Sequence, residues 1–325
     1  MVNAYPGIII LGPTASGKTR LAIALARLFH GEIVSCDALQ IYRHMNIGTA
    51  KVSPAEQGLV RHHMLDIRDP GEDFSAGDYQ RAAREAIGGI RARGHIPFVV
   101  GGSGFYLRAL IDGLFVGPAR AEELRARMRK IAKRKGPGIL HRMLQRVDPE
   151  SAGRLADAER IIRAYEVYLV SGKPMSWWQK QPRDVFKGYR WLKLGIEIPR
   201  VLLYPRIDQR VEEMFQGGFP EEVRGLLEKF PRDSQAFKAI GYRQIAEYID
   251  GKLSYQQAVE ETKMESRRYA KRQLTWFRSD PAIVWLDGQV DSEELQNRAS
   301  VMIGRFLDIQ PASQPVVRRG DGLED

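Results

Sequence analysis

The stretch GPTASGKT, residues 12–19, has the residue types and spacing of a loop that binds phosphate. Gly12 is followed by four residues and then by Gly17, Lys18 and Thr19, which is the P-loop pattern. In such a loop, backbone N–H groups surround phosphate oxygens at the start of a helix, and the lysine adds a positive charge. The Thr19 hydroxyl is a suitable ligand for Mg²⁺. We therefore predict a phosphate site formed by Gly12, Pro13, Thr14, Ala15, Ser16, Gly17, Lys18 and Thr19.

The carboxylate expected beside this loop is Asp37. P-loop enzymes that act on nucleotides usually hold Mg²⁺ with an aspartate placed after a buried strand. The apolar run at residues 98–100 is instead followed by the sequence GGS. Asp37 follows the apolar run at residues 32–36, and the carboxyl ends of parallel strands border the ligand crevice. Asp37 is therefore expected to face the bound phosphate group, and the alternative is an aspartate that caps a helix or closes a surface turn.

Two later stretches combine basic and aromatic residues. Residues 266–278, SRRYAKRQLTWFR, form a helical pattern with arginines four residues apart, one turn before Trp276. This mixture suits an RNA backbone and unstacked bases, and the alternative is an amphipathic surface helix with buried aromatic rings. In residues 237–244, FKAIGYRQ, Gly241 suggests a turn that presents an aromatic ring and a cation. The sequence therefore contains two stretches that could contact RNA.

Composition excludes several other classes of site. The only cysteine is Cys36, so an internal disulfide and a cysteine-based zinc site are both ruled out, and a reducing cytoplasm fits this count. The six histidines lack the spacing of metal ligands. We find no signal peptide at the N-terminus, and the run GIIIL is too short to span a membrane. A soluble, cytoplasmic protein is expected.

The elements that would position these residues alternate between strands and helices. A strand leads into the P-loop, a helix follows, and a second strand ends at Asp37, which is a βαβ unit and implies a parallel sheet. Ser75 and Asp78 form an S-x-x-D signature that opens a helix. The predicted elements are strands at residues 7–11, 32–36, 96–100 and 191–198, helices at 18–29, 75–94 and 105–110, and further helical segments from 208 to 277.

The positive charge is concentrated in one segment. The chain has a formal net charge of +10, and residues 120–190 contain 18 Lys and Arg against 8 Asp and Glu, so this segment accounts for the whole excess. A basic segment of this kind suits a polyanionic partner, and the alternative is an ordinary solvated helix surface. We predict an α/β fold, with a P-loop NTPase-like parallel sheet core interrupted by a basic all-helical insertion. The expected limits are residues 1–117 and 191–310 for the core, 118–190 for the insertion and 311–325 for a disordered tail.

Seven strings spread in order along the chain resemble the tRNA dimethylallyltransferase family. They are GPTASGKT (12–19), SCDALQIYRHMNIGTAK (35–51), HHMLDI (62–67), GGSGFYLRAL (101–110), ERIIRAYEV (159–167), AIGYRQ (239–244) and KRQLTWFR (271–278). The resemblance implies transfer of a dimethylallyl group from dimethylallyl diphosphate to N6 of the adenosine 3′ of the anticodon in tRNA. The P-loop would then hold the diphosphate leaving group, with Mg²⁺.

The resemblance also implies roles for individual residues. Asp37 matches the general base, and Lys18 and Thr19 would stabilise the departing diphosphate, with Thr19 as the metal ligand. The helical insertion would grip the anticodon stem-loop, and a monomer in the cytoplasm is expected. The residues implied to contact tRNA are Asp37, Ala38, Leu39, Gln40, Ser103, Glu159, Arg160, Arg163, Gly241, Tyr242, Arg243, Gln244, Lys271, Arg272, Gln273, Thr275, Trp276 and Arg278.

Three other functions remain open from the sequence. A P-loop phosphotransferase that acts on a small molecule would need the γ-phosphate of ATP. A non-catalytic RNA-binding module would not need Asp37. A related enzyme that prenylates free adenine nucleotides would share the P-loop and the aspartate, but the basic insertion and the stretch KRQLTWFR favour tRNA.

Overall fold

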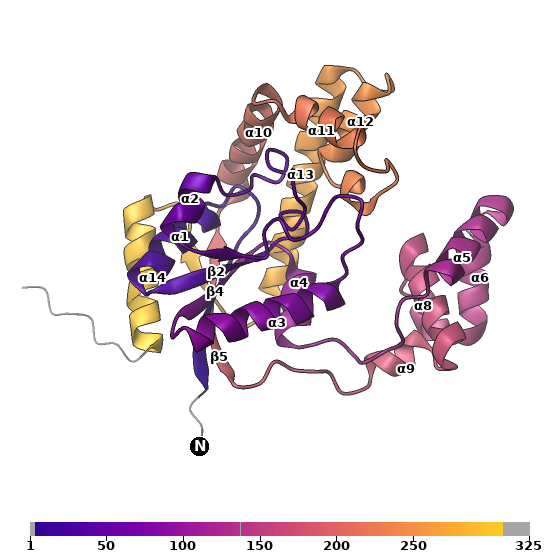
Figure 1. The fold of residues 1–325 in the computed structure, drawn as a ribbon, viewed down its shortest axis with the longest axis horizontal. Helices are drawn as coiled ribbons and strands as arrows, with labels where there is room; N and C mark the ends of the chain where they lie inside the picture. The colour runs from indigo at the N-terminus through magenta and orange to yellow at the C-terminus, as the bar shows by residue number, and fades with distance from the viewer. Residues whose placement is uncertain (1–3, 137, 308–325) are drawn as a thin grey trace, which may run out of the picture. The chain divides into compact units, whose positions relative to one another are not determined.

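The computed structural model describes residues 4–136 and 138–307, which divide into two compact units (Figure 1). The core unit contains the chain up to Leu110 and the chain from Lys187 onward, and the helical unit is Ile111–Phe186. The expected tail at residues 311–325 lies outside the described residues. Among the helices of the described ranges, none has both the length and the apolar character needed to cross a membrane.

The core unit is built on one sheet of six strands, and every pair of neighbouring strands is parallel. The strand order is β3-β2-β4-β1-β5-β6. Parallel strands need crossover connections and are covered on both faces, which explains why the first strands are continuous apolar runs. The predicted α/β class is confirmed. The strands are β1 (Tyr5–Leu11), β2 (Gly31–Cys36), β3 (His62–His63), β4 (Ile96–Gly101), β5 (Tyr189–Glu197) and β6 (Ile283–Asp287).

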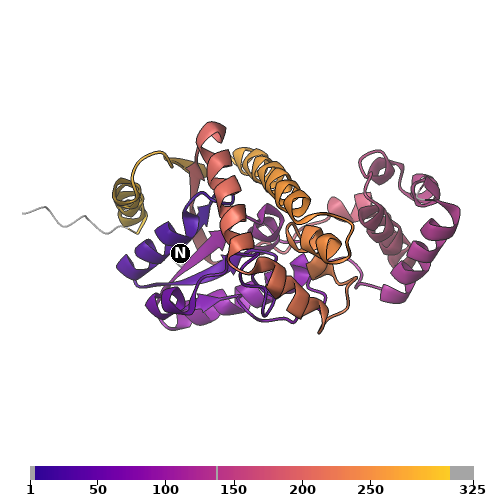
Figure 2. The same cartoon turned by 90° about the horizontal axis from the view of Figure 1, so that it is seen from above.

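Helices bury both faces of this sheet. Ile8 and Ile10 of β1 pack into a cluster with residues of α1 and α14, while α3 contacts β2 and β4. The long helices α10 and α13 lie side by side (Figure 2). The helices of the core unit are α1 (Lys18–Leu28), α2 (Pro54–Leu59), α3 (Ala76–Ala92), α4 (Gly104–Ile111), α10 (Arg200–Gln216), α11 (Phe219–Leu227), the 3₁₀ turn η1 (Gln235–Lys238), α12 (Tyr242–Ile249), α13 (Tyr255–Arg278) and α14 (Ser292–Phe306).

The helical unit has a core of its own, in which Met128, Leu144 and Ile162 are buried. Its first and last segments pair with each other, since the N–H of Phe186 donates to the carbonyl of Ile111 at 3.0 Å. This pairing explains why the unit spans residues 111–186 rather than the expected 118–190. Its helices are α5 (Glu122–Lys135), α6 (Gly138–Val147), α7 (Pro149–Ala152), α8 (Ala158–Ser171) and α9 (Met175–Gln179).

Local signals placed several elements correctly. The Ser75 hydroxyl accepts the N–H of Asp78 at 3.2 Å, and the Asp78 carboxylate accepts the N–H of Ser75 at 2.9 Å. This capping box begins α3, as predicted. The short elements α2 and β3, and the later elements β6 and α14, were not predicted.

Candidate active site at the carboxyl ends of the strands

The P-loop has the predicted context, because it joins the end of β1 to the start of α1. Gly17 has a φ of 81°, a left-handed conformation that favours glycine. Close packing also restricts Gly12, since a Cβ there would lie 2.5 Å from the Ser16 hydroxyl. That Ser16 oxygen is buried and has no hydrogen-bond partner in the described part of the chain. The loop is therefore a tight backbone turn with an unused polar atom at its centre.

Two cations converge on the cavity that this loop borders. Lys18 donates a hydrogen bond to the Pro13 carbonyl at 3.2 Å. Burial, reinforced by the neighbouring Arg210 guanidinium, lowers the pKa of Lys18 to about 8, although Asp37 opposes this effect. Burial likewise lowers the pKa of Arg210, again opposed by Asp37. Two half-buried cations near one carboxylate form a site for a ligand that carries more than one negative charge.

Asp37 stands directly after β2 and lines the same cavity. Its Oδ1 accepts the N–H of Leu39 at 2.8 Å, which fixes the carboxylate in a turn of its own backbone. The other oxygen, Oδ2, makes no hydrogen bond with the residues that the structure describes. The neighbouring Ala38 N–H donates to the Ser103 hydroxyl at 3.3 Å. Asp37 thus closes a turn, which was the alternative interpretation, and it also presents an oxygen to the cavity.

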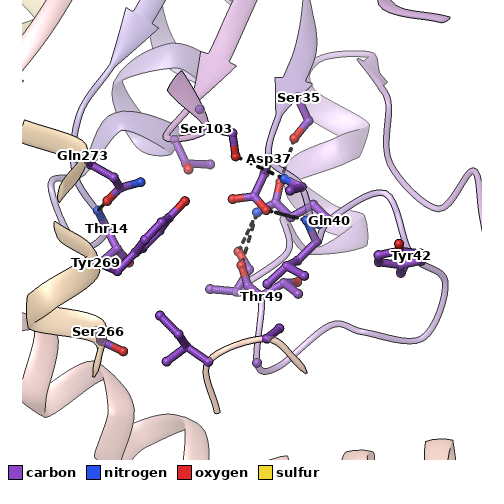
Figure 3. Close-up of a pocket in the computed structure, with 18 of the residues that line it drawn as sticks. Thr14, Ser35, Asp37, Gln40, Tyr42, Thr49, Ser103, Ser266, Tyr269 and Gln273 are labelled. Carbon is purple, nitrogen blue, oxygen red and sulfur yellow. Dashed lines mark hydrogen bonds between the residues drawn. The ribbon is translucent and has the colours of Figure 1, made fainter. Parts of the chain in front are cut away.

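The cavity has a volume of about 490 Å³ and combines polar groups with apolar walls. One side is formed by the P-loop and the turn at Asp37, and the other by α10 and α13. Figure 3 shows the Tyr269 ring reaching from α13 toward Asp37 and Ser103. Burial, followed by the Asp37 charge, raises the pKa of Tyr269 to about 12, so its phenol stays protonated. Further lining residues are Ile207, Val211, Met214, Phe219, Thr262 and Ser266.

Two glutamines expected at the RNA surface are instead used inside the core unit. The Gln40 side-chain amide accepts a hydrogen bond from the Ser35 hydroxyl at 3.0 Å and donates to the Thr49 carbonyl at 3.3 Å, and it also lines the cavity. Gln273 accepts the N–H of Thr14 at 3.0 Å and donates to the Gly102 carbonyl at 2.9 Å. The buried Gln273 therefore ties the P-loop to the loop after β4.

The AIGYRQ stretch has a role different from the expected one. Tyr242 and Gln244 are completely buried, and the Gln244 side chain accepts the N–H of Gly241 at 2.8 Å to begin α12. The Tyr242 hydroxyl donates to Glu222 at 2.7 Å, and Glu222 also accepts backbone N–H groups of the loop at residues 46–48. Gly241, Tyr242 and Gln244 therefore position loops. Only Arg243 of this stretch is exposed.

The C-terminal run presents cations at the surface of α13. Lys271, Arg272 and Thr275 are exposed, whereas Trp276 is half-buried against α4. Arg278 is exposed but forms an ion pair with Glu197 at 2.6 Å. The expected RNA-binding face of α13 is thus narrower than the sequence suggested. Some residues of the helix are exposed at its surface, whereas others, such as Gln273, are buried and line the cavity.

In the helical unit, two of the three expected contact residues form internal ion pairs. Arg163 contacts the fully buried Glu166 at 2.6 Å, and Arg125 contacts the same carboxylate at 2.9 Å. Glu159 pairs with Arg129 at 2.8 Å. Arg160 is exposed and forms no ion pair with the described residues. The other exposed cations on α5 and α6 of this unit are Arg127, Lys130, Lys133, Arg134, Lys135, Arg142 and Arg146.

Sequence reasoning missed Arg210 and Tyr269, although a signal was present. Arg210 follows the buried Ile207 by three residues, which places a cation on the apolar face of α10. Tyr269 follows Thr262 by seven residues and precedes Gln273 by four, so the three share one face of α13. A polar or charged residue at helical spacing within a buried face is therefore worth testing as part of a cavity, although Glu166 and Gln244 occupy such positions and serve internal contacts instead.

Comparison with known proteins adds independent observations. The sequence profile described as IPP transferase matches residues 40–280. A tRNA dimethylallyltransferase of Koribacter versatilis is 47% identical over 297 residues, which is 91% of this chain and 97% of the relative. Another, of Geobacillus thermodenitrificans, is 48% identical over 284 residues, covering 86% of this chain and 90% of the relative.

Solved structures are similar over the same length. The crystal structure of a tRNA isopentenylpyrophosphate transferase from Bacillus halodurans is similar with a TM-score of 0.71 and 36% identity, covering 94% of this chain and 97% of the other. A eukaryotic dimethylallyltransferase, described as acting on tRNA, is similar with a TM-score of 0.78 and 27% identity, covering 96% of this chain and 82% of the other. Both similarities span the core unit and the helical unit.

Proposed function

The chain belongs to the IPP transferase family, and we propose that it transfers a dimethylallyl group from dimethylallyl diphosphate to N6 of the adenosine 3′ of the anticodon in tRNA. Diphosphate is the other product. The observation that carries this proposal is one cavity in which the P-loop, two half-buried cations and the Asp37 carboxylate meet.

The cations stabilise the leaving group. When the C–O bond of dimethylallyl diphosphate breaks, negative charge develops on the bridging oxygen and spreads over the diphosphate. Lys18, Arg210 and the N–H groups of the P-loop are already in place where this charge develops, and such preorganised stabilisation is usually the largest catalytic effect. Because this chemistry transfers carbon rather than phosphorus, no γ-phosphate is required.

Mg²⁺ fits this site as a shared cation rather than as one held by the protein alone. The described residues contain no group of three or more His, Cys, Asp or Glu side chains that could hold a metal ion. Mg²⁺ commonly binds through one or two protein oxygens together with substrate phosphates. The Thr19 hydroxyl would supply such an oxygen, and the ion would add positive charge beside the diphosphate.

Asp37 acts as the general base. An adenine amine is a weak nucleophile because its lone pair is delocalised into the ring. The N6 nitrogen attacks the allylic carbon as the C–O bond breaks, and the free oxygen of Asp37 takes the N6 proton. A positioned base of this kind contributes about 10²- to 10⁴-fold in rate. The target base must leave its stack to reach this carboxylate.

The tRNA partner accounts for the exposed cations on both units. The exposed residues of α5 and α6 form a basic surface on the helical unit that suits the phosphate backbone of the anticodon stem. On the core unit, Arg243, Lys271 and Arg272 supply further exposed positive charge. We also propose that a monomer is sufficient and that the protein acts in the cytoplasm.

The test offers labelled dimethylallyl diphosphate with an anticodon stem-loop, with AMP and with no acceptor. We expect label on the stem-loop only, at the adenosine 3′ of the anticodon. Asp37→Asn should lower kcat about 10²- to 10⁴-fold and leave stem-loop affinity nearly unchanged. Labelled AMP would indicate a nucleotide prenyltransferase, and ATP consumption without prenyl transfer would indicate a phosphotransferase. Full activity of Asp37→Asn would remove the proposed base.

A further inference from the structure

A row of aromatic and arginine side chains runs from the cavity to the surface of the core unit. Tyr269 lines the cavity, and the Arg272 guanidinium lies 5.8 Å from the centre of its ring. Trp276 follows Arg272 by one turn of α13, and Arg108 of α4 stacks over the Trp276 ring at 4.3 Å. Phe105 shares the exposed face of α4 with Arg108. We call these five residues the aromatic strip.

Phe105 is unusual for its residue type in this chain. All 12 phenylalanines fall within the described residues, and Phe105 is the only exposed one, at 56%. Its neighbours Tyr106 and Leu107 are buried and already anchor α4. A single exposed apolar side chain is common on protein surfaces, so its position matters more than its exposure. Phe105 follows Ser103, which lines the cavity, by only two residues.

The strip is held in place by close packing. A Cβ on Gly104 would lie only 2.2 Å from the Trp276 ring, so the ring packs directly on the backbone at the start of α4. Arg108 covers another part of the same ring. The Trp276 ring therefore joins α13 to α4 close to Phe105, and a ligand would meet a surface that is partly ordered in advance.

The charges of the strip are not neutralised locally. Arg108 and Arg272 are exposed, and neither forms an ion pair with the described residues. An exposed aromatic ring beside unpaired arginines, here Phe105 beside Arg108, is typical of surfaces that stack unpaired bases and attract phosphates. A lipid surface would favour a larger apolar patch, and an acidic peptide would leave Phe105 unused.

We propose that the aromatic strip binds a nucleotide that flanks the acceptor adenosine, with its base stacked on Phe105 and its phosphate beside Arg108. This inference rests on the proposed function, which puts the acceptor base in the cavity next to Ser103 and Tyr269. Tyr269 belongs to both the cavity and the strip, and Phe105 follows Ser103 by two residues, so the nucleotide next to the bound acceptor reaches the strip first.

The first test measures prenyl transfer to the stem-loop by Phe105→Ala. Stacking is worth about 1–3 kcal/mol per base, so we expect the KM for the stem-loop to rise about 5- to 150-fold. The kcat and the KM for dimethylallyl diphosphate should remain those of the wild type. Phe105→Tyr should restore binding, because it keeps the ring. Leu28→Ala is the control, since Leu28 is also exposed, at 54%, but lies at the far end of α1.

The second test pairs the variant with stem-loops that carry an abasic site on either side of the acceptor. For the wild type, one of the two abasic stem-loops should have a KM raised by the same factor that Phe105→Ala produces with the intact stem-loop. Combining that abasic stem-loop with Phe105→Ala should raise the KM no further. An unchanged KM for Phe105→Ala, or losses that multiply for both substrates, would overturn the stacking contact while leaving the proposed function intact. A wild type that transfers no prenyl group to the unmodified stem-loop would overturn both.

Discussion

Gln273 offers the most direct test of how the P-loop is held. Its side-chain amide spans two loops, accepting the N–H of Thr14 at 3.0 Å and donating to the carbonyl of Gly102 at 2.9 Å. Replacement by alanine removes both hydrogen bonds and leaves both backbone groups facing a partly solvated cavity. A hydrogen bond contributes about 1 kcal/mol net to stability, so the loss is about 2 kcal/mol. The P-loop should then relax in the free enzyme.

The binding of dimethylallyl diphosphate must restore the loop geometry. At 1.4 kcal/mol per factor of ten, the full loss corresponds to about a 30-fold increase in KM for dimethylallyl diphosphate. Partial replacement of the hydrogen bonds by water would reduce this to about 3-fold. The KM for the stem-loop should change little, because the Gln273 side chain is buried.

The assay measures initial rates against dimethylallyl diphosphate at saturating stem-loop, together with the melting temperature. Gln273→Glu keeps the acceptor for Thr14 but turns a carboxylate oxygen toward the Gly102 carbonyl and adds a negative charge to the cavity, so its KM for dimethylallyl diphosphate should rise at least as far as that of Gln273→Ala. Gln256→Ala is the control, because Gln256 is an exposed glutamine on the same helix. An unchanged KM for dimethylallyl diphosphate with a raised KM for the stem-loop would show that Gln273 does not hold the P-loop. That result would make Gln273 the RNA contact that its sequence motif suggested.

Three further predictions concern pH and salt. Because burial lowers the pKa of Lys18 to about 8, kcat/KM for dimethylallyl diphosphate should fall as pH rises through about 8. Lys18→Arg should abolish that fall, because arginine stays charged in this range. A fall with the same midpoint in Lys18→Arg would show that another group titrates. Although burial raises the pKa of Glu32, hydrogen bonds from Arg93, His63 and His95 outweigh it and hold the value at about 2. The stability that Glu32 contributes is therefore present above pH about 4.5 and lost as pH falls toward 2, so Glu32→Gln should flatten the acid fall in melting temperature, whereas the exposed control Glu85→Gln should not. Finally, stem-loop affinity measured by fluorescence anisotropy should fall steeply with salt. Replacing the exposed Lys133 and Arg134 together by alanine should reduce the slope of log affinity against log salt concentration by about 1 to 2. An unchanged slope would exclude both residues as phosphate contacts.

The sequence predicted the parts of the site that depend on local backbone geometry. The P-loop and the capping box at Ser75 are each determined within a few residues, so spacing alone indicated them, whereas the turn that Asp37 closes was only the alternative interpretation of that residue. The α/β class followed from the βαβ start for the same reason. The position of β6 at the sheet edge depends on long-range pairing with β5, which no local pattern records.

Side-chain direction was the main source of error. Gln40, Tyr242 and Gln273 have the residue types of base-reading side chains, yet each is directed into the protein and satisfies buried backbone or carboxylate groups. Their sequence spacing is the same in either case. Only the packing of α12 and α13 against the loops of the sheet decides between them, and this packing is a tertiary property.

The place of β1 in the middle of the sheet has a consequence for synthesis of the chain on the ribosome. The P-loop follows β1, and one of the two strands beside β1 is β5. The two strands are far apart in the sequence, since Tyr5 of β1 lies opposite Tyr189 of β5. Until translation has passed β5, a nascent chain must keep one edge of β1 without its partner, whereas the helices between Ile111 and Phe186 can already form from local contacts. Fragments that stop within those helices should therefore aggregate or require chaperones, even though every residue of the P-loop is present.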